Sequence, residues 1–124
     1  MILVDSSVWI DHLRGGDADL VGALEAGLVM THPVVIGEIA LGNLRRRDVI
    51  LESLQALPQA AAASDAEILV MIAAHSLAGS GIGYSDAQLI AGLLLTPGAK
   101  LWTRDRRLRA VAARLALAAG PAYH

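Results

Sequence analysis

Cysteine is absent from the 124 residues of this chain. Its absence excludes disulfide bonds, thiolate metal sites and cysteine nucleophiles, and it suits a reducing cytosol. No uninterrupted apolar run approaches the roughly 18 residues that a membrane-spanning helix needs. The first residues also lack the positive segment and the long apolar core that are typical of a secretory signal. We therefore expect a cytoplasmic protein without membrane association.

A large excess of charge of either sign is also missing. The formal net charge is −2, which argues against a general nucleic-acid coat protein, because such a protein would be strongly basic. The basic residues are nevertheless clustered in two runs, which fit either solvated helix faces or a phosphate-binding rim around an acidic centre. The two runs comprise Arg45, Arg46 and Arg47, and then Lys100, Arg104, Arg106, Arg107 and Arg109.

Apolar residues, by contrast, are abundant. They make up 55% of the chain, against about 45–50% in ordinary proteins even when glycine is counted. This composition excludes intrinsic disorder, supports one core, and leaves apolar surface for a partner. Because repeats, low-complexity tracts and linkers are missing, we expect a single domain over residues 1–124.

Short apolar runs alternate with helical segments along the chain. Ile2-Leu3-Val4 is wholly apolar, which indicates a strand buried in a parallel sheet, and further strands are expected at 28–31 and 100–103. Ser64 to Glu67 and Ser85 to Gln88 have the spacing of a capping box. This alternation predicts an α/β domain with a mostly parallel sheet and helices on both faces. The helices are expected at 6–13, 17–26, 33–44, 46–57, 64–77, 85–96 and 105–115.

Four acidic residues fall where a parallel sheet binds ligands, beyond the carboxyl ends of its strands. Asp5 follows the first strand, and Asp105 follows the strand at 100–103. Asp86 opens a helix after a glycine loop, and Glu38 lies in the helix after the second strand. Carboxylate oxygens are the ligands that Mg²⁺ and Mn²⁺ prefer. The sequence therefore predicts four carboxylates that meet around a divalent cation.

Three of these acids also have purely structural explanations. Asp5 and Asp105 could each cap the helix that follows, and the helix dipole favours Asp86 in a first turn by about 0.3–1 kcal/mol. The remaining acids, including Asp11 and Asp17, fall at helix starts or on polar faces and need no special role. The glycine loop from Gly79 to Gly83 matches no known phosphate cradle, and the histidines lack metal-ligand spacing.

Glu38 is the most informative of the four acids. Its helical neighbours Val34, Val35 and Leu41 are apolar, so we expect it on the face that turns inward. A buried carboxylate is costly without compensation. Either a nearby cation or an arginine from the run at 45–47 could provide that compensation.

Four segments of the chain together resemble one family. They are Met1-Ile-Leu-Val-Asp-Ser-Ser-Val-Trp-Ile-Asp11, Gly37-Glu38-Ile39, Ser85-Asp86-Ala87 and Thr103-Arg-Asp105-Arg-Arg-Leu108. In this order and approximate spacing they resemble the PIN-domain proteins, in particular the VapC toxins of bacterial toxin–antitoxin pairs. The resemblance covers nearly the whole chain. It implies a PIN-like three-layer α/β/α domain with a mostly parallel central sheet.

The resemblance further implies a Mg²⁺-dependent (or Mn²⁺-dependent) endoribonuclease that hydrolyses RNA. Asp5, Asp86 and Asp105 would hold one or two ions, and Glu38 would hold or deprotonate the attacking water. The hydrolysis would leave a 5′-phosphate and a 3′-hydroxyl.

Other residues are matched to supporting roles by the same resemblance. The hydroxyls of Ser6 and Thr103 would orient carboxylates or a water molecule at the metal. Arg104, Arg106 and Arg107, next to the last acid, are candidates for RNA-backbone contacts, which position RNA without reading its sequence.

A partner is implied as well. A VapB-type antitoxin would lay an apolar segment along the toxin and place a basic residue in the acidic pocket. The surplus of apolar residues fits this interface or a homodimer. Three alternatives stay open: a PIN-like nuclease with a housekeeping role in RNA maturation or DNA cleavage, a phospho-acceptor or phosphatase domain, and a binding domain with a structural acid cluster. The phosphatase type expects a second aspartate at position 7, where this chain has Ser7.

Overall fold

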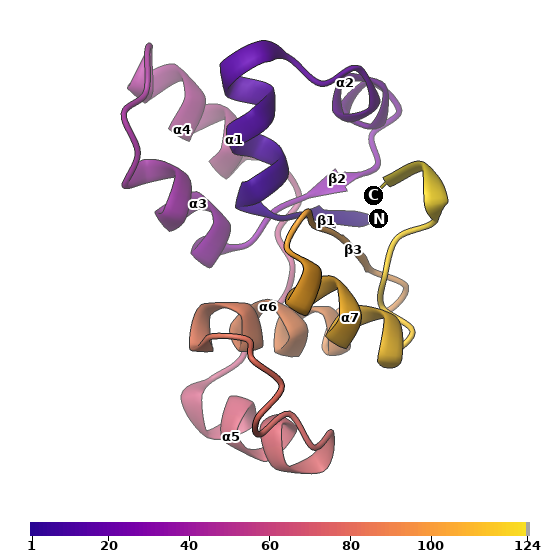
Figure 1. Cartoon of the computed structure of the whole chain (residues 1–124). Coiled ribbons are helices and arrows are strands. Elements are labelled where there is room, and N and C mark those ends of the chain that lie inside the picture. Colours follow the sequence, from indigo (N-terminus) through magenta and orange to yellow (C-terminus); the bar gives the residue numbers. More distant parts are fainter. Residues whose placement is uncertain (124) are drawn as a thin grey trace.

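The computed structural model describes residues 1–123 and is built around a three-stranded parallel sheet. The strands are β1 (Ile2–Val4), β2 (Val29–Met30) and β3 (Lys100–Trp102), in the order β2-β1-β3. Ile2 of the central strand pairs with β2 at Val29 and with β3 at Lys100. Strands β1 and β3, which are far apart in the sequence, therefore lie side by side in the sheet (Figure 1), and the predicted parallel sheet is confirmed.

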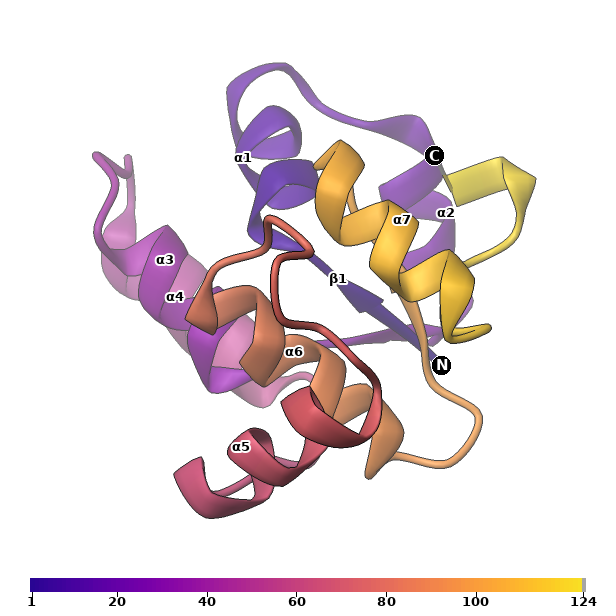
Figure 2. The same cartoon turned by 60° about the horizontal axis from the view of Figure 1, so that its bottom comes forward.

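Helices cover both faces of this sheet, as expected for an α/β/α domain. Figures 1 and 2 show α1 and α2 on one side of the strands and α6 and α7 on the other, with α5 outside α6. No helix of the described chain is long and apolar enough to cross a bilayer. The helices are α1 (Ser6–Gly15), α2 (Ala18–Glu25), α3 (Pro33–Ala40), α4 (Arg47–Ala56), α5 (Asp65–Ala74), α6 (Tyr84–Leu94), α7 (Arg106–Arg114) and the short 3₁₀ helix η1 (Pro121–Tyr123).

Capping side chains explain where several helices begin. Ser64 and Glu67 form the predicted capping box, in which the Ser64 Oγ accepts from the Glu67 amide at 3.1 Å and Glu67 accepts from the Ser64 amide at 2.9 Å. Asp17 caps α2 by accepting from the Leu20 amide at 2.9 Å. Each cap satisfies amides that the first helical turn leaves without partners. These starts were therefore predictable from local sequence.

The end of α3 differs from the prediction. The helix stops at Ala40 rather than near residue 44, and Leu41 is 90% exposed. Val35 and Ile39 form the buried face, whereas Glu38 is exposed. The expected inward position of Glu38 was wrong, because Leu41 belongs to the helix terminus and no longer follows the helical period.

The start of α6 also differs from the prediction. Gly83 is the N-cap residue, and no side chain caps the helix. Ser85 lies one residue inside the helix, so the second predicted capping box is wrong. Asp86 occupies the acidic position of that motif, and the Gly83 backbone partly offsets the rise in the pKa of its carboxyl. The helix cap therefore lies two residues earlier than expected.

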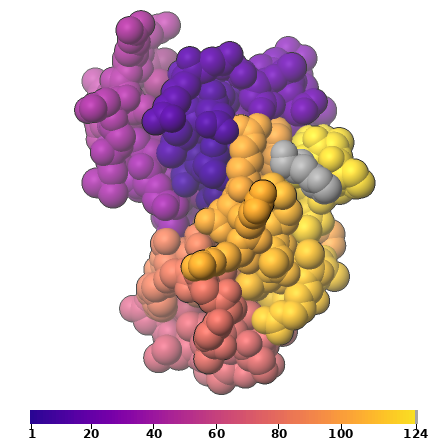
Figure 3. Space-filling model, viewed as in Figure 1, coloured from indigo at the N-terminus to yellow at the C-terminus, as the bar shows by residue number. Residues whose placement is uncertain are grey.

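Single bridges extend both edges of the sheet, and the sequence pattern did not reveal them. Thr31 forms a parallel bridge with Gln59 next to β2, and Leu101 forms one with Ala118 next to β3. The segment after α7, ambiguous in sequence, is thus held against β3 by two backbone hydrogen bonds of 2.6 and 2.8 Å. Figure 3 shows this C-terminal segment and α7 on the same surface of the molecule.

Candidate active site

Acidic side chains gather beyond the carboxyl edge of the sheet. The pKa of Glu38 is raised, first by desolvation and then by the negative charges of Asp5 and Asp86. The pKa of Asp86 is raised in the same way, first by desolvation and then by the charges of Asp5 and Asp105. One carboxylate affects the pKa of another in this way only at short range. The structure therefore brings Asp5, Glu38, Asp86 and Asp105, here called the acidic cluster, into one neighbourhood.

Burial differs among the four acids. Asp5 is 6% exposed and lies deepest, Asp86 is half-buried, and Glu38 and Asp105 are exposed. The side chain of Asp105 also caps α7 by accepting from the Leu108 amide at 2.9 Å. The cap uses Oδ1 alone, and the second carboxylate oxygen of Asp105 makes no hydrogen bond with residues 1–123, so it is available to a ligand.

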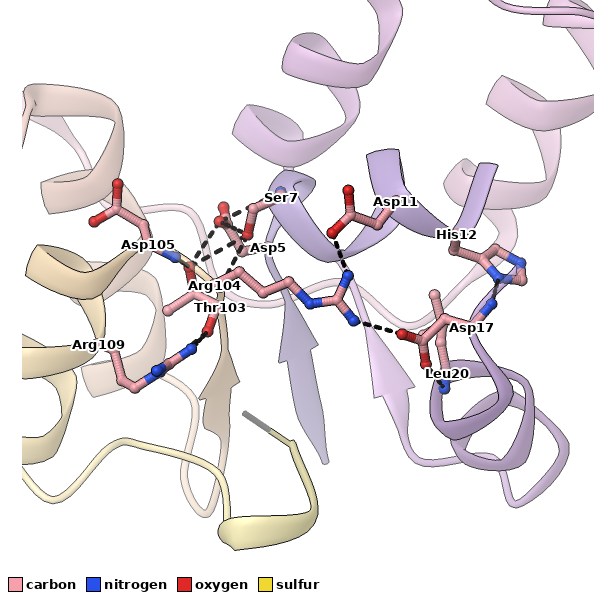
Figure 4. A network of polar contacts seen from close by, with 10 residues as sticks. All are labelled: Asp5, Ser7, Asp11, His12, Asp17, Leu20, Thr103, Arg104, Asp105 and Arg109. Atoms are coloured by element: carbon pink, nitrogen blue, oxygen red, sulfur yellow. Dashed lines mark hydrogen bonds and ion pairs between the residues drawn. The ribbon is translucent and has the colours of Figure 1, made fainter. Parts of the chain in front are cut away.

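Two hydroxyl groups hold Asp5 in place (Figure 4). Ser7 Oγ lies 2.7 Å from Asp5 Oδ2, and Thr103 Oγ1 lies 2.8 Å from the same oxygen. Both hydroxyls donate to Oδ2, while Oδ1 receives no hydrogen bond within the described chain. The free oxygen is therefore the one that a ligand at this edge would meet.

Thr103 is itself held from several directions. Its Oγ1 accepts from the Asp105 amide at 3.1 Å, and its carbonyl accepts from Arg109 Nη2 at 2.8 Å. Ser6, the other predicted hydroxyl, instead lies near Glu38 and partly lowers the pKa of that carboxyl. Ser7 was not singled out in sequence, although a hydroxyl two residues after an N-cap aspartate is well placed to contact it.

Arg104 lies between two of these residues but points away from the acidic cluster. Its guanidinium forms ion pairs with Asp11 on α1 and with Asp17 at the start of α2. Its backbone amide donates to Ser7 Oγ at 3.1 Å. The pKa of Asp17 is lowered, first by the Leu20 amide and then by Arg104. Arg104 therefore ties β3 to two distant helices, and it is less available to RNA than expected.

The donor set fits a divalent cation. As the side chains stand, no three aspartate, glutamate or histidine residues within 1–123 are close enough to hold a metal ion. The charges that act on Glu38 and Asp86 are nevertheless all negative. Because Glu38 and Asp105 are exposed, their side chains can rotate toward Asp5 without disturbing the core. Binding of Mg²⁺ or Mn²⁺, which prefer hard oxygen donors, would relieve the repulsion between these carboxylates.

The fold and the acidic cluster together define a divalent-metal-dependent nuclease of the α/β class. Comparison with known proteins agrees with this assignment. The model of the PIN domain matches residues 2–114. Ribonuclease VapC32, from two strains of Mycobacterium tuberculosis, is 46% identical over 118 residues, which cover 95% of this chain and 95% of the relative. The chain therefore belongs to the PIN-domain family. Its identity to VapC32 supports a VapC-type member of that family.

Proposed function

We propose that this chain is a Mg²⁺- or Mn²⁺-dependent endoribonuclease that acts as the toxin of a VapBC-type toxin–antitoxin module. One structural observation carries the proposal: four carboxylates from separate parts of the chain gather at the carboxyl edge of the sheet, where the negative charges of neighbouring members raise the pKa of Glu38 and of Asp86. The 46% identity to a protein named as a VapC ribonuclease supports RNA as the substrate. The match over residues 2–114 supports one PIN-like domain for the chain.

Each residue of the site would have a separate role in the proposed hydrolysis of RNA. The ion or ions would be held by Asp5, Asp86 and Asp105. Such an ion would lower the pKa of the attacking water and neutralise charge on the phosphoryl oxygens. Glu38 would accept the proton of the attacking water, because a carboxyl with a raised pKa is a better base near neutral pH. Ser7 and Thr103 hold Asp5, as described above.

An antitoxin of the VapB type is the partner that the surface supports. Two adjoining grooves, of about 510 and 220 Å³, lie between α1 and α4 and share Leu13 and Ile50. Glu38 lies at the rim of the larger groove, beside apolar Ile10 and Ile39. An apolar segment of the antitoxin would fill these grooves and bring a basic side chain to the acidic cluster.

A homodimer and a cytoplasmic location complete the proposal. The apolar groove between α5 and α6, about 460 Å³, is lined by Val70, Met71, Leu94 and Leu95. Exposed apolar surface of this kind is typical of an interface, and a second copy would cover it. The absence of cysteine suits the cytoplasm.

The experiment compares matched charge-removing variants in RNA cleavage. The purified chain, freed of antitoxin, should cleave single-stranded RNA with Mg²⁺ or Mn²⁺ and leave 5′-phosphate ends. Asp86→Asn and Asp105→Asn should abolish cleavage, whereas Asp19→Asn, an exposed acid on α2, should not. Circular dichroism should show that all three variants are folded.

Cleavage retained by both Asp86→Asn and Asp105→Asn would defeat the assignment. Growth provides a second readout, since expression of the chain without its antitoxin should arrest cells. Harmless overexpression together with intact nuclease activity would favour a housekeeping PIN-like nuclease instead.

A further inference from the structure

A cleft of about 470 Å³ runs along α7 beside the loop that precedes α6. Its walls come from residues 76–80 on one side and from α7 on the other. Figure 3 shows the coral-coloured segment around residue 80 beside the orange surface of α7. Because Asp105 is the N-cap residue of α7, the cleft starts next to the acidic cluster and leads away from it.

Three arginines of α7 face this cleft. Arg106, Arg107 and Arg114 line it, and none of them forms an ion pair with a carboxylate of the described residues. Arg114 Nη1 donates to the His75 carbonyl at 3.0 Å, which anchors the helix end to the loop and leaves the other guanidinium nitrogens free. Positions 106 and 114 share one helical face with Ala110. The cleft therefore carries uncompensated positive charge along its length, although the whole chain is slightly acidic.

The opposite wall contributes a hydroxyl and a glycine. Ser80 Oγ is buried without a hydrogen-bond partner in residues 1–123, which costs free energy unless a ligand satisfies it. Gly81 has a φ of +88°, and a Cβ there would lie 3.0 Å from Arg107 Cδ. The glycine loop, which matched no phosphate cradle in sequence, thus makes room for an arginine side chain.

We propose that this cleft holds the RNA backbone next to the cleaved phosphodiester, with Arg106, Arg107 and Arg114 contacting phosphates and Ser80 donating to one of them. The inference rests on the proposed ribonuclease function. Guanidinium groups match phosphate oxygens in charge and geometry. The nine residues of α7 span ~13 Å, and phosphates of a stacked strand follow one another about every 3.4 Å along the axis. The cleft is therefore long enough for more than one phosphate.

The cleft makes a specific prediction for binding without cleavage. In an Asp86→Asn background, affinity for a labelled single-stranded RNA is measured by fluorescence anisotropy over a series of salt concentrations. Arg106→Gln, Arg107→Gln and Arg114→Gln should each weaken binding about 3- to 10-fold, regardless of sequence, and should each reduce the salt slope by about 0.7. In the cleavage-competent chain the same variants should raise KM and leave kcat nearly unchanged.

Two matched variants serve as controls. Lys100→Gln removes the same charge at the start of β3, at the opposite edge of the sheet, and should change neither affinity nor slope. Arg106→Lys keeps the charge and should keep the parental slope. Arg106 and Arg107 are exposed, so their substitution leaves the fold intact, as thermal unfolding would verify.

The outcomes separate this inference from the proposed function. If the three Arg→Gln variants bind RNA like Lys100→Gln while the parent chain cleaves RNA, the cleft assignment is wrong and the ribonuclease stands. If they keep RNA affinity but lose affinity for the antitoxin, the cleft is a protein-docking surface and the inference is overturned. A parent chain that neither binds nor cleaves RNA would overturn both.

Discussion

Thr103 Oγ1 donates a hydrogen bond of 2.8 Å to Asp5 Oδ2 across 98 positions of sequence. The same hydroxyl oxygen accepts from the Asp105 amide at 3.1 Å. One buried side chain therefore sets the relative positions of the acid after β1 and the acid that caps α7. This hydroxyl therefore links two members of the acidic cluster directly.

Thr103→Val removes the hydroxyl and keeps the shape of the side chain. Metal-dependent cleavage should fall about 10- to 100-fold, as is usual when a residue that orients a metal ligand is changed. The free energy of unfolding should fall by roughly 1–3 kcal/mol, because two buried groups lose their partner. Steady-state kinetics and urea denaturation measure the two effects. Thr103→Ser should restore most of both, and a Thr103→Val variant with parental kcat would contradict the positioning role.

Asp86→Asn should stabilise the metal-free protein while it abolishes activity. The pKa of Asp86 is raised in the fold, so the folded carboxyl binds its proton more tightly than the unfolded one. Stability is therefore lost as pH rises from about 3.8, the ordinary value, through the raised pKa, and the loss persists at neutral pH. Asparagine removes this loss, and we expect Tm at pH 7 to rise by about 2–5 °C.

Divalent cations should reverse the order of stability between the parent chain and the Asp86→Asn variant. Added Mg²⁺ binds the folded parent and raises its Tm, whereas Asp86→Asn should respond much less. Differential scanning calorimetry with and without the ion measures both shifts. Equal Mg²⁺ responses in the two proteins would count against Asp86 as a ligand.

His32 should make the protein sensitive to mild acid. It is 3% exposed and caps α3, with Nδ1 accepting from the Val34 amide at 3.0 Å. Burial lowers the pKa of His32 below 6.5, so the unfolded chain binds this proton more tightly. Stability is full above about pH 6.5 and is lost as pH falls through the lowered pKa.

His32→Asn keeps a capping oxygen and does not titrate in this range. We expect its unfolding free energy, measured by urea denaturation, to change less between pH 7.5 and pH 5.5 than that of the parent. The absolute stability of the variant can be lower, since the slope with pH is the quantity compared. Equal slopes would show that another group carries the acid sensitivity.

Gly92→Ala should destabilise the fold by about 1–3 kcal/mol, because an added Cβ would lie 2.6 Å from the Ala61 carbonyl oxygen and 3.1 Å from His32 Cδ2. Gly37→Ala on α3 is the matched control, because nothing lies within 4 Å of a Cβ at that position. Alanine favours helix over glycine by about 0.5–1 kcal/mol, so this control should be stabilised. Chemical denaturation of both variants tests the pair, and a neutral Gly92→Ala would show that α6 can shift away from residue 61.

Local signals explain how much of the fold could be predicted. The apolar run of β1, the Ser64–Glu67 capping box and the cap by Asp105 each act within a few residues, and the structure contains all three. The gathering of the acids was also predictable, because parallel strands bring their carboxyl ends to one edge. The exposure of Glu38 was not, since it depends on where α3 ends relative to the core.

Long-range pairings were beyond the reach of sequence patterns. Asp11 and Asp17 lie 93 and 87 positions from Arg104, and nothing near any of them marks the pair. The basic residues at 100–109 likewise make different contacts, and these differences can be recognised only in the three-dimensional structure. Arg104 binds carboxylates and Arg109 binds the Thr103 carbonyl, whereas Arg106 and Arg107 face the cleft along α7.

The bridges at Gln59 and Ala118 bear on how this protein meets other molecules. A sheet of three short strands with open borders would invite another chain to add a strand through backbone amides. Here neighbouring segments of the same chain already occupy part of each border. We therefore expect association through side chains on the helices, where a few substitutions can change which partner is accepted without altering the sheet.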